Sequence, residues 1–452
     1  MNNEEAQRTI DRGIKFLSAC QNADGSWSGD YGGPMFLLPM YVAACHVCGQ
    51  TVPEPRRGGM VRYLKSVQNP DGSIGLHVED AGSMFTSVLG YAALRILGVP
   101  RDDDAALRLR GWILGHGTAL GCASWGKLML AVMNLYPYEG LNPITPELWL
   151  LPYSAPIHPG RMWCHARLVY LPMAWLYGKR AAVIEGDLIR ELRADLYDRD
   201  YGEIDFAAHR DTVSDFDNRY PATAALKAVN KAMAAFEAAC PGALRKKALH
   251  AVLEHIRYED RTTSDINIGP VNSVLNAIVH HFNSPGGDEF RRSFGRLNDY
   301  VFEGHDGIKF NGYNSTALWD TAFAAQALMA APDAKRNAGA LMGARSFIAE
   351  NRIAGDPPDR AKHFRDRTRG GWPFSDRHNG WPVSDCTAEG LSATIELRGI
   401  IGETIPDDLL HESVDLLLES QNGDGGWASY ERKRGSDLLE LLNPSQVFGS
   451  IM

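Results

Sequence analysis

A seven-residue motif occurs three times in this chain and constrains its fold more than any other feature. The copies read QNADGSW at 21–27, QNPDGSI at 68–74 and QNGDGGW at 421–427, and a looser copy, GGWPFS, begins at Gly370. Each full copy follows a stretch with helical spacing of apolar residues, and Asn-x-Asp-Gly predicts a turn whose glycine takes a positive φ. We expect the Gln to bond carbonyls left open at the helix end while the Trp packs over it. The motif is therefore interpreted as a clamp that ties one helix hairpin to the next.

Helix pairs are predicted along the whole chain. The first two copies start 47 residues apart, which suits a helix-pair repeat, and strand-like alternation is scarce. Stacked helix pairs form either an open solenoid or a ring closed as an α/α barrel. The ring is favoured because terminal repeats with a polar capping face are not obvious. The predicted fold class is all-α, with α/α barrels built from helix pairs and clamp motifs. The expected helices include 83–97, 146–151, 168–177, 222–239, 246–258, 271–282, 316–331 and 338–350.

The length of the chain favours two domains. At 452 residues it can bury a large core and exceeds the usual size of one domain. A polar stretch near 200–220 is a reasonable boundary. We therefore expect two domains, at 1–215 and 216–452. The last hairpin looks unfinished where the chain stops at Met452.

Composition excludes several classes of protein. The chain is 44% hydrophobic and 22% charged, as globular proteins are, and its net charge of −9 argues against a nucleic-acid partner. Seven widely spaced cysteines and no recognisable signal peptide predict free thiols in a reducing compartment. Cys45 and Cys48 lie in the apolar run MFLLPMYVAACHVC, which favours buried helix cysteines over a metal site. That run is too short to span a bilayer, so any membrane contact is expected to be peripheral.

The stretch from Gly370 to Glu389 carries the most distinctive chemistry. It reads GGWPFSDRHNGWPVSDCTAE and gathers aromatic residues before a carboxylate, Asp385, that is followed by a thiol, Cys386. The pattern becomes helical after Ser384, so Ser384 is the predicted N-cap and Asp385 lies in the first turn. An acid among aromatic faces suits a reaction through carbocations. The plainer interpretation is an acidic helix start packed on a core.

Several segments together resemble one known family. They are GDYGGPMFLLP (29–39), WCHARLVYLP (163–172), GYNSTALWDTAF (312–323) and VSDCTAEG (383–390). With the repeated clamp motifs they are similar, in order and over essentially the whole chain, to the oxidosqualene cyclases. Squalene–hopene cyclases share the fold but carry a D-x-D-D acid motif that this sequence lacks, so the resemblance implies an epoxide substrate. It also implies two α/α barrels around a large apolar cavity, with the N-terminal barrel at 1–215 and the first part of a second, incomplete barrel at 216–452. No metal and no other cofactor is implied. A peripheral, monotopic position is implied too, on the cytoplasmic side of a membrane or on a lipid-droplet surface.

The resemblance assigns roles to individual residues. Asp385 matches the acid that protonates the epoxide, with its pKa expected to be raised by burial. Cys386 matches a hydrogen-bond donor to that acid, whereas a second donor cysteine of the family would lie past Met452. His165 matches a histidine near the late cation, and plain core packing is its alternative. The remaining matches are aromatic positions that face cations or line the cavity, namely Trp319, Phe374, Trp125, Trp163 and Tyr31.

Three further positions bear on the product. Tyr313, Asn379 and Val383 occupy places that differ between members that form lanosterol and members that form cycloartenol. Val in place of Ile and Asn in place of His resemble the lanosterol-forming plant pattern. A smaller residue there gives the final cation room to lose a different proton. The predicted product is therefore lanosterol.

The leading hypothesis is an intramolecular transferase, that is an isomerase, acting on oxidosqualene. One alternative is a truncated, inactive cyclase fragment, or a non-enzymatic helical-repeat protein that binds a triterpene or a companion chain completing the second barrel. Another is a protein prenyltransferase β subunit, which shares the barrel but whose zinc ligands have no convincing counterpart. Repeated exposed Trp residues could also serve as stacking platforms for a polysaccharide.

Overall fold

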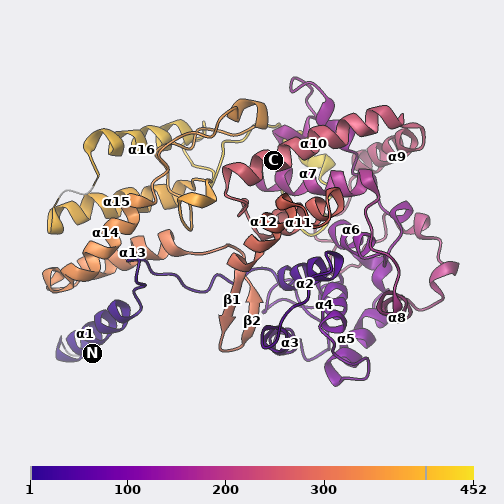
Figure 1. Ribbon diagram of the computed structural model, residues 1–452, viewed down its shortest axis with the longest axis horizontal. Coiled ribbons are helices and arrows are strands. Elements are labelled where there is room, and N and C mark those ends of the chain that lie inside the picture. Colours follow the sequence, from indigo (N-terminus) through magenta and orange to yellow (C-terminus); the bar gives the residue numbers. More distant parts are fainter. Residues whose placement is uncertain (1–2, 403–404) are drawn as a thin grey trace. The chain divides into compact units, whose positions relative to one another are not determined.

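The computed structural model describes residues 3–402 and 405–452, and the described chain is mainly helical (Figure 1). The all-α prediction is confirmed. A two-stranded sheet, β1 (Val301–Gly304) and β2 (Gly307–Phe310), accompanies the helices. The α-helices are α1 (Asn3–Ala19), α2 (Leu37–Val47), α3 (Arg56–Ser66), α4 (Met84–Ile96), α5 (Asp104–Gly115), α6 (Ser124–Val132), α7 (Cys164–Lys179), α8 (Asp187–Leu196), α9 (Ala224–Ala239), α10 (Gly242–Thr262), α11 (Pro270–Asn283), α12 (Asp288–Arg296), α13 (Ala317–Met329), α14 (Ala338–Glu350), α15 (Ser384–Ile401) and α16 (Asp407–Ser420).

The expected helices form, with one exception. The segment 146–151 is a 3₁₀ turn, Pro146–Leu150, and not an α-helix. It lies between Pro146 and Pro152, so it is too short to pay back helix nucleation, and the residue before a proline avoids α geometry. The antiparallel pairing of β1 with β2 was not predicted. Strands of four residues are too short to show a clear period of two.

The chain divides into two compact units. The first unit contains Met1–Tyr31, Arg261–Ile268 and Tyr313–Lys433, and the second contains Gly32–Asp260, Gly269–Gly312 and Arg434–Met452. The predicted boundary at 215 lies inside the second unit. The units divide the chain differently because α9 to α12 continue the unit that α2 begins, whereas α1 joins the later helices. Two barrels divided at that position stay a prediction.

The first unit is built on α13, α14 and α15, each of which packs against the other two, with α16 beside α15 (Figure 1). Its core is apolar and joins Trp27 to residues of α13–α16 and the segments between them. Trp27, Leu341 and Trp372 are buried in this cluster, with exposed fractions of 4%, 0% and 0%. Large buried aromatic residues of this kind contribute several kcal/mol each.

In the second unit α2 packs on α4 and α11, and α11 packs on α7. All residues of α2 but His46 are buried. Cys45 and Cys48 are free and buried, which confirms the interpretation of the CxxC as helix cysteines. Burial raises the pKa of the Cys45 thiol to about 12. Burial also raises the pKa of Cys48 well above its usual range.

The clamps form, but the Trp and the Gln bond different helices from those predicted. In the first clamp the Trp27 indole N–H donates to Leu17 O near the end of α1, at 2.7 Å. The Gln21 amide donates to Gly25 O and also to Ala340 O in the first turn of α14, both at 2.9 Å. The Trp therefore bonds the helix that precedes the clamp, α1, and the Gln bonds the start of a different helix, α14.

Candidate active site

The helix start that carries Asp385 differs from its prediction. Helix α15 begins at Ser384, and Val383 is its N-cap residue, without a side-chain cap bond. Ser384 was therefore wrongly predicted as the N-cap. Val383 is extended, and its carbonyl accepts the N–H of Thr387 at 2.8 Å, which makes it the last residue before the helix. Asp385 is the second helical residue, and its Oδ1 accepts the N–H of Cys386 at 2.7 Å.

Asp385 and Cys386 lie in opposite environments. Asp385 is exposed, whereas Cys386 is completely buried. The expectation that Asp385 is buried is therefore wrong for the described residues. Consecutive helical residues point about 100° apart, so a buried Cys386 at the core turns Asp385 toward the open side. Burial, and next the neighbouring Asp385 carboxylate, raise the pKa of the Cys386 thiol well above its usual range.

Four of the predicted aromatic residues form one cluster around Phe374. The rings of Tyr31 and Tyr313 each meet Phe374 edge-on with centroids 5.0 Å apart. Trp319 stacks on Phe374 with a centroid distance of 5.8 Å and an interplanar angle of 27°. Backbone bonds fix this arrangement, because Trp319 N–H donates to Phe374 O at 3.3 Å. The cluster presents several π faces within the unit that holds Asp385.

Of the three product-related residues, Tyr313 belongs to this cluster and is hydrogen-bonded to Asn379. The Tyr313 hydroxyl donates to Asn379 Oδ1 at 3.3 Å, and the Asn379 amide donates to Asn267 O at 3.0 Å. Asn379 is fully buried and Val383 is 5% exposed. A further residue, Tyr430, was not predicted, and its hydroxyl lies 3.4 Å from that of Tyr313. No local motif links positions more than a hundred residues apart.

Sequence reasoning also missed Arg365. Its guanidinium lies 3.5 Å from the centroid of the Trp381 ring, and it donates to Gly380 O at 2.8 Å. Both Arg365 and Trp381 are buried. A cation on this indole face holds the loop that leads into α15. The FRDR segment that contains Arg365 has no pattern that could have indicated this.

The other predicted site residues lie in the second unit. Trp163, which is 40% exposed, stacks on His165 with a centroid distance of 4.7 Å and an interplanar angle of 26°. The Trp163 N–H donates to Ile451 O at 3.0 Å, and the Cys164 thiol lies 3.7 Å from His165 Nδ1. Trp163 is thus the residue before α7, and its indole ring stacks on the imidazole ring of His165 in the first turn of that helix.

A cavity of about 230 Å³ in the second unit is lined by Trp125 and Tyr170. The Trp125 indole N–H donates to the Tyr170 hydroxyl at 3.2 Å. Burial raises the pKa of Tyr170 well above its usual range, so the hydroxyl stays neutral. Most of the other lining is apolar and includes Leu226 and Met233 of α9. The predicted cavity-wall residue Trp125 therefore borders a hydrophobic cavity.

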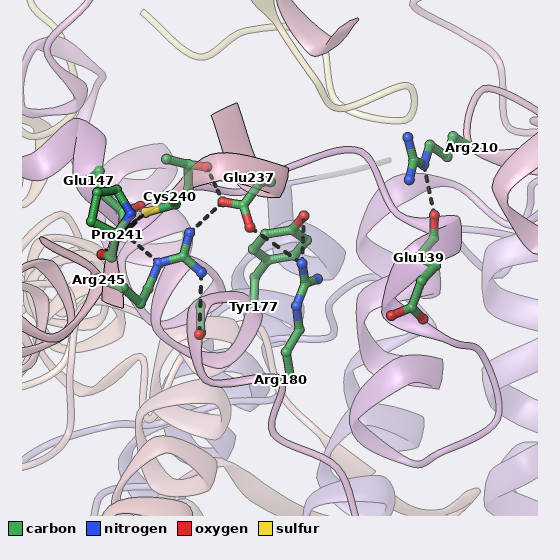
Figure 2. A network of polar contacts seen from close by, with 11 residues as sticks. Glu139, Glu147, Tyr177, Arg180, Arg210, Glu237, Cys240, Pro241 and Arg245 are labelled. Atoms are coloured by element: carbon green, nitrogen blue, oxygen red, sulfur yellow. Dashed lines mark hydrogen bonds and ion pairs between the residues drawn. The ribbon is translucent and has the colours of Figure 1, made fainter. Parts of the chain in front are cut away.

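An ionic network holds the end of the helix that forms one wall of this cavity (Figure 2). Arg245 pairs with Glu147 at 2.5 Å and with Glu237 at 2.6 Å, and Arg180 approaches Glu237 at 3.3 Å. Thr145 also donates to Glu237, at 2.7 Å. Since these carboxylates are at most 10% exposed, they need such partners. The network fixes α9 by its C-terminal turn.

Two general properties complete the description of the site. In the described ranges, no cluster of His, Cys, Asp and Glu is arranged to hold a metal ion. Over the same residues, every helix is too short or too polar to cross a membrane.

Comparison with known proteins identifies the family. The squalene–hopene cyclase N-terminal domain model matches residues 10–283, and the corresponding C-terminal domain model matches residues 315–446. A cycloartenol synthase from Dictyostelium discoideum is 42% identical over 99% of this chain, and the human lanosterol synthase is 43% identical over 97% of it. An alpha-onocerin synthase from Lycopodium clavatum is 34% identical over 99% of the chain.

The relatives are longer than this chain. It spans 64% of the Dictyostelium protein and 61% of the human protein. The resemblance to oxidosqualene cyclases is confirmed by the names of these relatives and by both domain models. The chain belongs to the squalene–hopene cyclase family of terpene cyclases.

Proposed function

We propose that this chain carries the acid-bearing part of an oxidosqualene cyclase, which converts (3S)-2,3-oxidosqualene into a tetracyclic sterol precursor. Asp385 transfers its proton to the epoxide oxygen, and the C–O bond to the tertiary carbon breaks as an alkene attacks that carbon. The positive charge then moves along the folded polyene until a proton is lost from the last cation. Reactant and product are isomers, so the reaction consumes no oxidant or reductant.

The observation that carries this proposal is the position of Asp385 next to a buried thiol, in the unit that holds the Phe374 cluster. The Cys386 thiol stays protonated, because burial raises its pKa, so it remains a donor to the carboxylate left after proton transfer. The faces of Trp319 and Phe374 are suited to cations, at about 1–2 kcal/mol for each desolvated contact. His165 and the walls near Trp125 and Trp163 are proposed to serve the later cations.

The exposure of Asp385 favours a second candidate, in which the chain acts only when another segment covers it. Keeping an aspartic acid protonated at pH 7 in water costs about 4 kcal/mol, and burial is what reduces that cost. A companion chain that covers the open side of α15 would supply this burial. Alone, the chain would then bind a triterpene without converting it.

We further infer lanosterol as the product. The support is the Tyr313–Asn379 hydrogen bond and the burial of the small Val383 side chain. Val383 and Asn379 have shorter side chains than the Ile and His of other members, so they leave more room around the final cation. The chain matches relatives named as lanosterol synthases and also one named as a cycloartenol synthase, so the product needs a direct measurement.

A lipid surface is the proposed location. Oxidosqualene is a long hydrocarbon that partitions into lipid, so an enzyme that takes it up gains from peripheral contact with a bilayer or droplet. We therefore infer monotopic association with the cytoplasmic side of a membrane. Flotation of the purified chain with phosphatidylcholine vesicles would measure this contact.

The experiment is an assay of the 452-residue chain with (3S)-2,3-oxidosqualene in detergent, followed by gas chromatography–mass spectrometry. It is run on the chain alone and with the portion of human lanosterol synthase that lies outside the match. The variants are Asp385→Asn and, as a matched control, Asp408→Asn, since Asp408 is the exposed second residue of α16.

Lanosterol from the parent and from Asp408→Asn, with none from Asp385→Asn, is the expected result. Product only in the presence of the added portion would establish the need for a cover. No cyclised product in either condition, from a chain that circular dichroism shows to be helical, would overturn the proposed activity.

A further inference from the structure

A run of basic residues precedes one serine near the end of the chain. Residues 432–436 read RKRGS, so Lys433 and Arg434 lie three and two residues before Ser436. No other serine or threonine in the sequence has Lys or Arg at both of these positions. Protein kinases select substrates by charge patterns of this kind, because acidic groups on the kinase bind the basic side chains while the hydroxyl enters the active site. The pattern makes Ser436 a candidate substrate, provided that its hydroxyl is accessible.

The structure presents Ser436 in the form that a kinase requires. Ser436, Arg432 and Lys433 are exposed, and Arg434 is partly exposed. Residues 432–434 have no regular secondary structure, and Ser436 has extended backbone angles, φ of −77° and ψ of 143°. Such a segment fits along a kinase groove without the unfolding of a helix or strand. The Ser436 hydroxyl accepts the N–H of Leu438 at 3.3 Å, so its own proton stays available for transfer.

A neighbouring arginine is placed to hold a phosphate on this serine. The Arg161 guanidinium donates to three backbone carbonyls, one of which is that of Arg434 at 3.4 Å. The carbonyl of Arg161 itself lies 3.3 Å from the place that a Cβ on Gly435 would take. Arg161 therefore lies beside the residues that lead directly into Ser436. Within the described ranges its guanidinium pairs with carbonyls and with no carboxylate, so its charge lacks an anionic partner.

We propose that Ser436 is a phosphorylation site of an arginine-directed protein kinase and that its phosphate pairs with Arg161. In the transfer, Ser436 Oγ attacks the γ-phosphorus of ATP and the P–O bond to ADP breaks, while a carboxylate base of the kinase takes the hydroxyl proton. The phosphoserine carries about two negative charges at pH 7 and offers three acceptor oxygens. Arg161 binds such a group through two parallel N–H donors.

The phosphate connects two parts of the cavity wall. Ser436 immediately precedes the 3₁₀ turn Asp437–Leu442, whose last residue lines the cavity of the second unit. Arg161 ends another 3₁₀ turn, Pro159–Arg161, whose first residue lines the same cavity. A phosphate on Ser436 that is bonded to Arg161 ties these two turns together. Phosphorylation is thus a means of stiffening this wall, whatever the cavity binds.

A membrane of acidic lipids is the alternative partner of the basic run. The residues that follow the serine argue against it, because Asp437 is adjacent and the Glu440 carboxylate lies one turn later, where it accepts the N–H of Met452 at 2.9 Å. Anionic headgroups that approach this surface meet these two acids together with the basic residues. A kinase instead binds the residues before the serine, which are basic without exception from Arg432 to Arg434.

The experiment treats the folded 452-residue protein with the catalytic subunit of cyclic-AMP-dependent protein kinase and Mg·ATP. Intact and tandem mass spectrometry should find one phosphoryl group, on Ser436, and none in Ser436→Ala. Ser264→Ala is the matched control and should not change the uptake. Ser264 is also exposed but has a basic residue, Arg261, at the first of the two positions and a threonine at the second.

Two further variants test the charge pattern. Arg434→Ala should slow phosphorylation of Ser436 about tenfold or more, because one charge-assisted hydrogen bond to the kinase is lost. Asp437→Asn should speed it, because the acidic groups of the kinase that attract Arg434 repel Asp437. Equal rates in the parent and in Arg434→Ala would show that the basic run does not direct the kinase.

Phosphorus NMR of the phosphorylated protein measures the contact with Arg161. A nearby cation favours the doubly charged phosphate, so its second pKa should lie about one unit below the usual value of about 6. Arg161→Gln should bring this pKa back toward 6. The same variant should be phosphorylated at the parental rate, since Arg161 lies outside the segment that the kinase binds.

Three results would overturn the proposal. A folded protein that takes up no phosphate on Ser436 removes the modification site. A second pKa that is the same in the parent and in Arg161→Gln removes the pairing. Flotation with phosphatidylserine vesicles that is lost in Lys433→Ala, together with no phosphorylation, assigns the basic run to a lipid surface. None of these measurements requires cyclase activity, so this site and the proposed activity can fail separately.

Discussion

The first and the last clamp have nearly the same sequence and the same local bonds, yet only one of them is buried. Both Gln side chains bond the carbonyl of the clamp glycine, and both indoles bond a carbonyl in the preceding helix. Trp27 is 4% exposed and Trp427 is 47% exposed. The difference is that α14 begins at the first clamp.

This comparison separates two contributions to the clamp. The turn forms from its own seven residues, because Asn, Asp and Gly satisfy one another locally. Burial comes only from the helix that docks on it, and burial is the larger energy term for a tryptophan. A clamp without its helix is therefore a formed but weakly stabilising structure.

The largest test of the comparison is the pair Trp27→Ala and Trp427→Ala. Loss of the buried indole should destabilise the first unit by about 3–5 kcal/mol. Loss of the exposed indole should cost less than about 1 kcal/mol. Chemical denaturation followed by circular dichroism measures both. Equal losses would show that the last clamp is covered in solution.

A middle-sized effect is expected from the pair Gln21→Ala and Gln421→Ala. Gln21 makes two amide–carbonyl bonds, one of them to α14, so its loss should cost about 1–2 kcal/mol. Gln421 bonds within its own turn, at the surface, and should cost about 0.5 kcal/mol or less. Thermal midpoints of the two variants and of the parent give the comparison. A larger loss from Gln421→Ala would contradict the assignment of an open clamp.

The smallest effect concerns Glu412 of α16, which lies against Gly370 at the start of the looser clamp copy, and it depends on pH. Hydrogen bonds from Arg369 and then from Arg352 lower the pKa of Glu412 below its usual value of 4.5. A lowered pKa in the folded state stabilises the protein above pH 4.5, and this stabilisation is lost as the pH falls through the folded value. Glu412→Gln should therefore lower the thermal midpoint at pH 7 and have little effect in strong acid.

Glu419→Gln is the control for this pH dependence. Glu419 lies on the same helix and also pairs with an arginine, but its side chain is 57% exposed. Such surface pairs contribute little to stability. A pH-dependent loss of the same size in both variants would show that Glu412 has no special part in the clamp.

Much of the architecture could be read from the sequence. The apolar period of α4, α7, α9 to α11, α13 and α14 is long enough to give the helices, and the repeated motif gives the turns. The β hairpin at 301–310 was not predicted, because a strand of four residues has too few positions to show an alternation of apolar and polar residues. The segment 146–151 is a 3₁₀ turn and not the predicted α-helix, because the prolines at both of its ends outweigh its apolar spacing.

The candidate site was only partly predictable. The DCTAE segment and the aromatic positions around Phe374 could be found from local motifs. Tyr430 and Arg365 could not, since they reach the site from distant parts of the chain. The exposure of Asp385 was predicted wrongly, because burial of a helix face depends on what packs against it and not on the residues of that face.

The sequence by itself determined the helices, the clamp turns and the residue types of the site, since these depend on bonds between residues close in the chain. Only the tertiary structure decided which clamps hold a helix, because Gln21 meets Ala340 across more than three hundred residues. It also decided that Cys386 is buried and Asp385 exposed. Contacts of that range are set by how whole helices pack, and a single stretch of sequence carries no record of its neighbours.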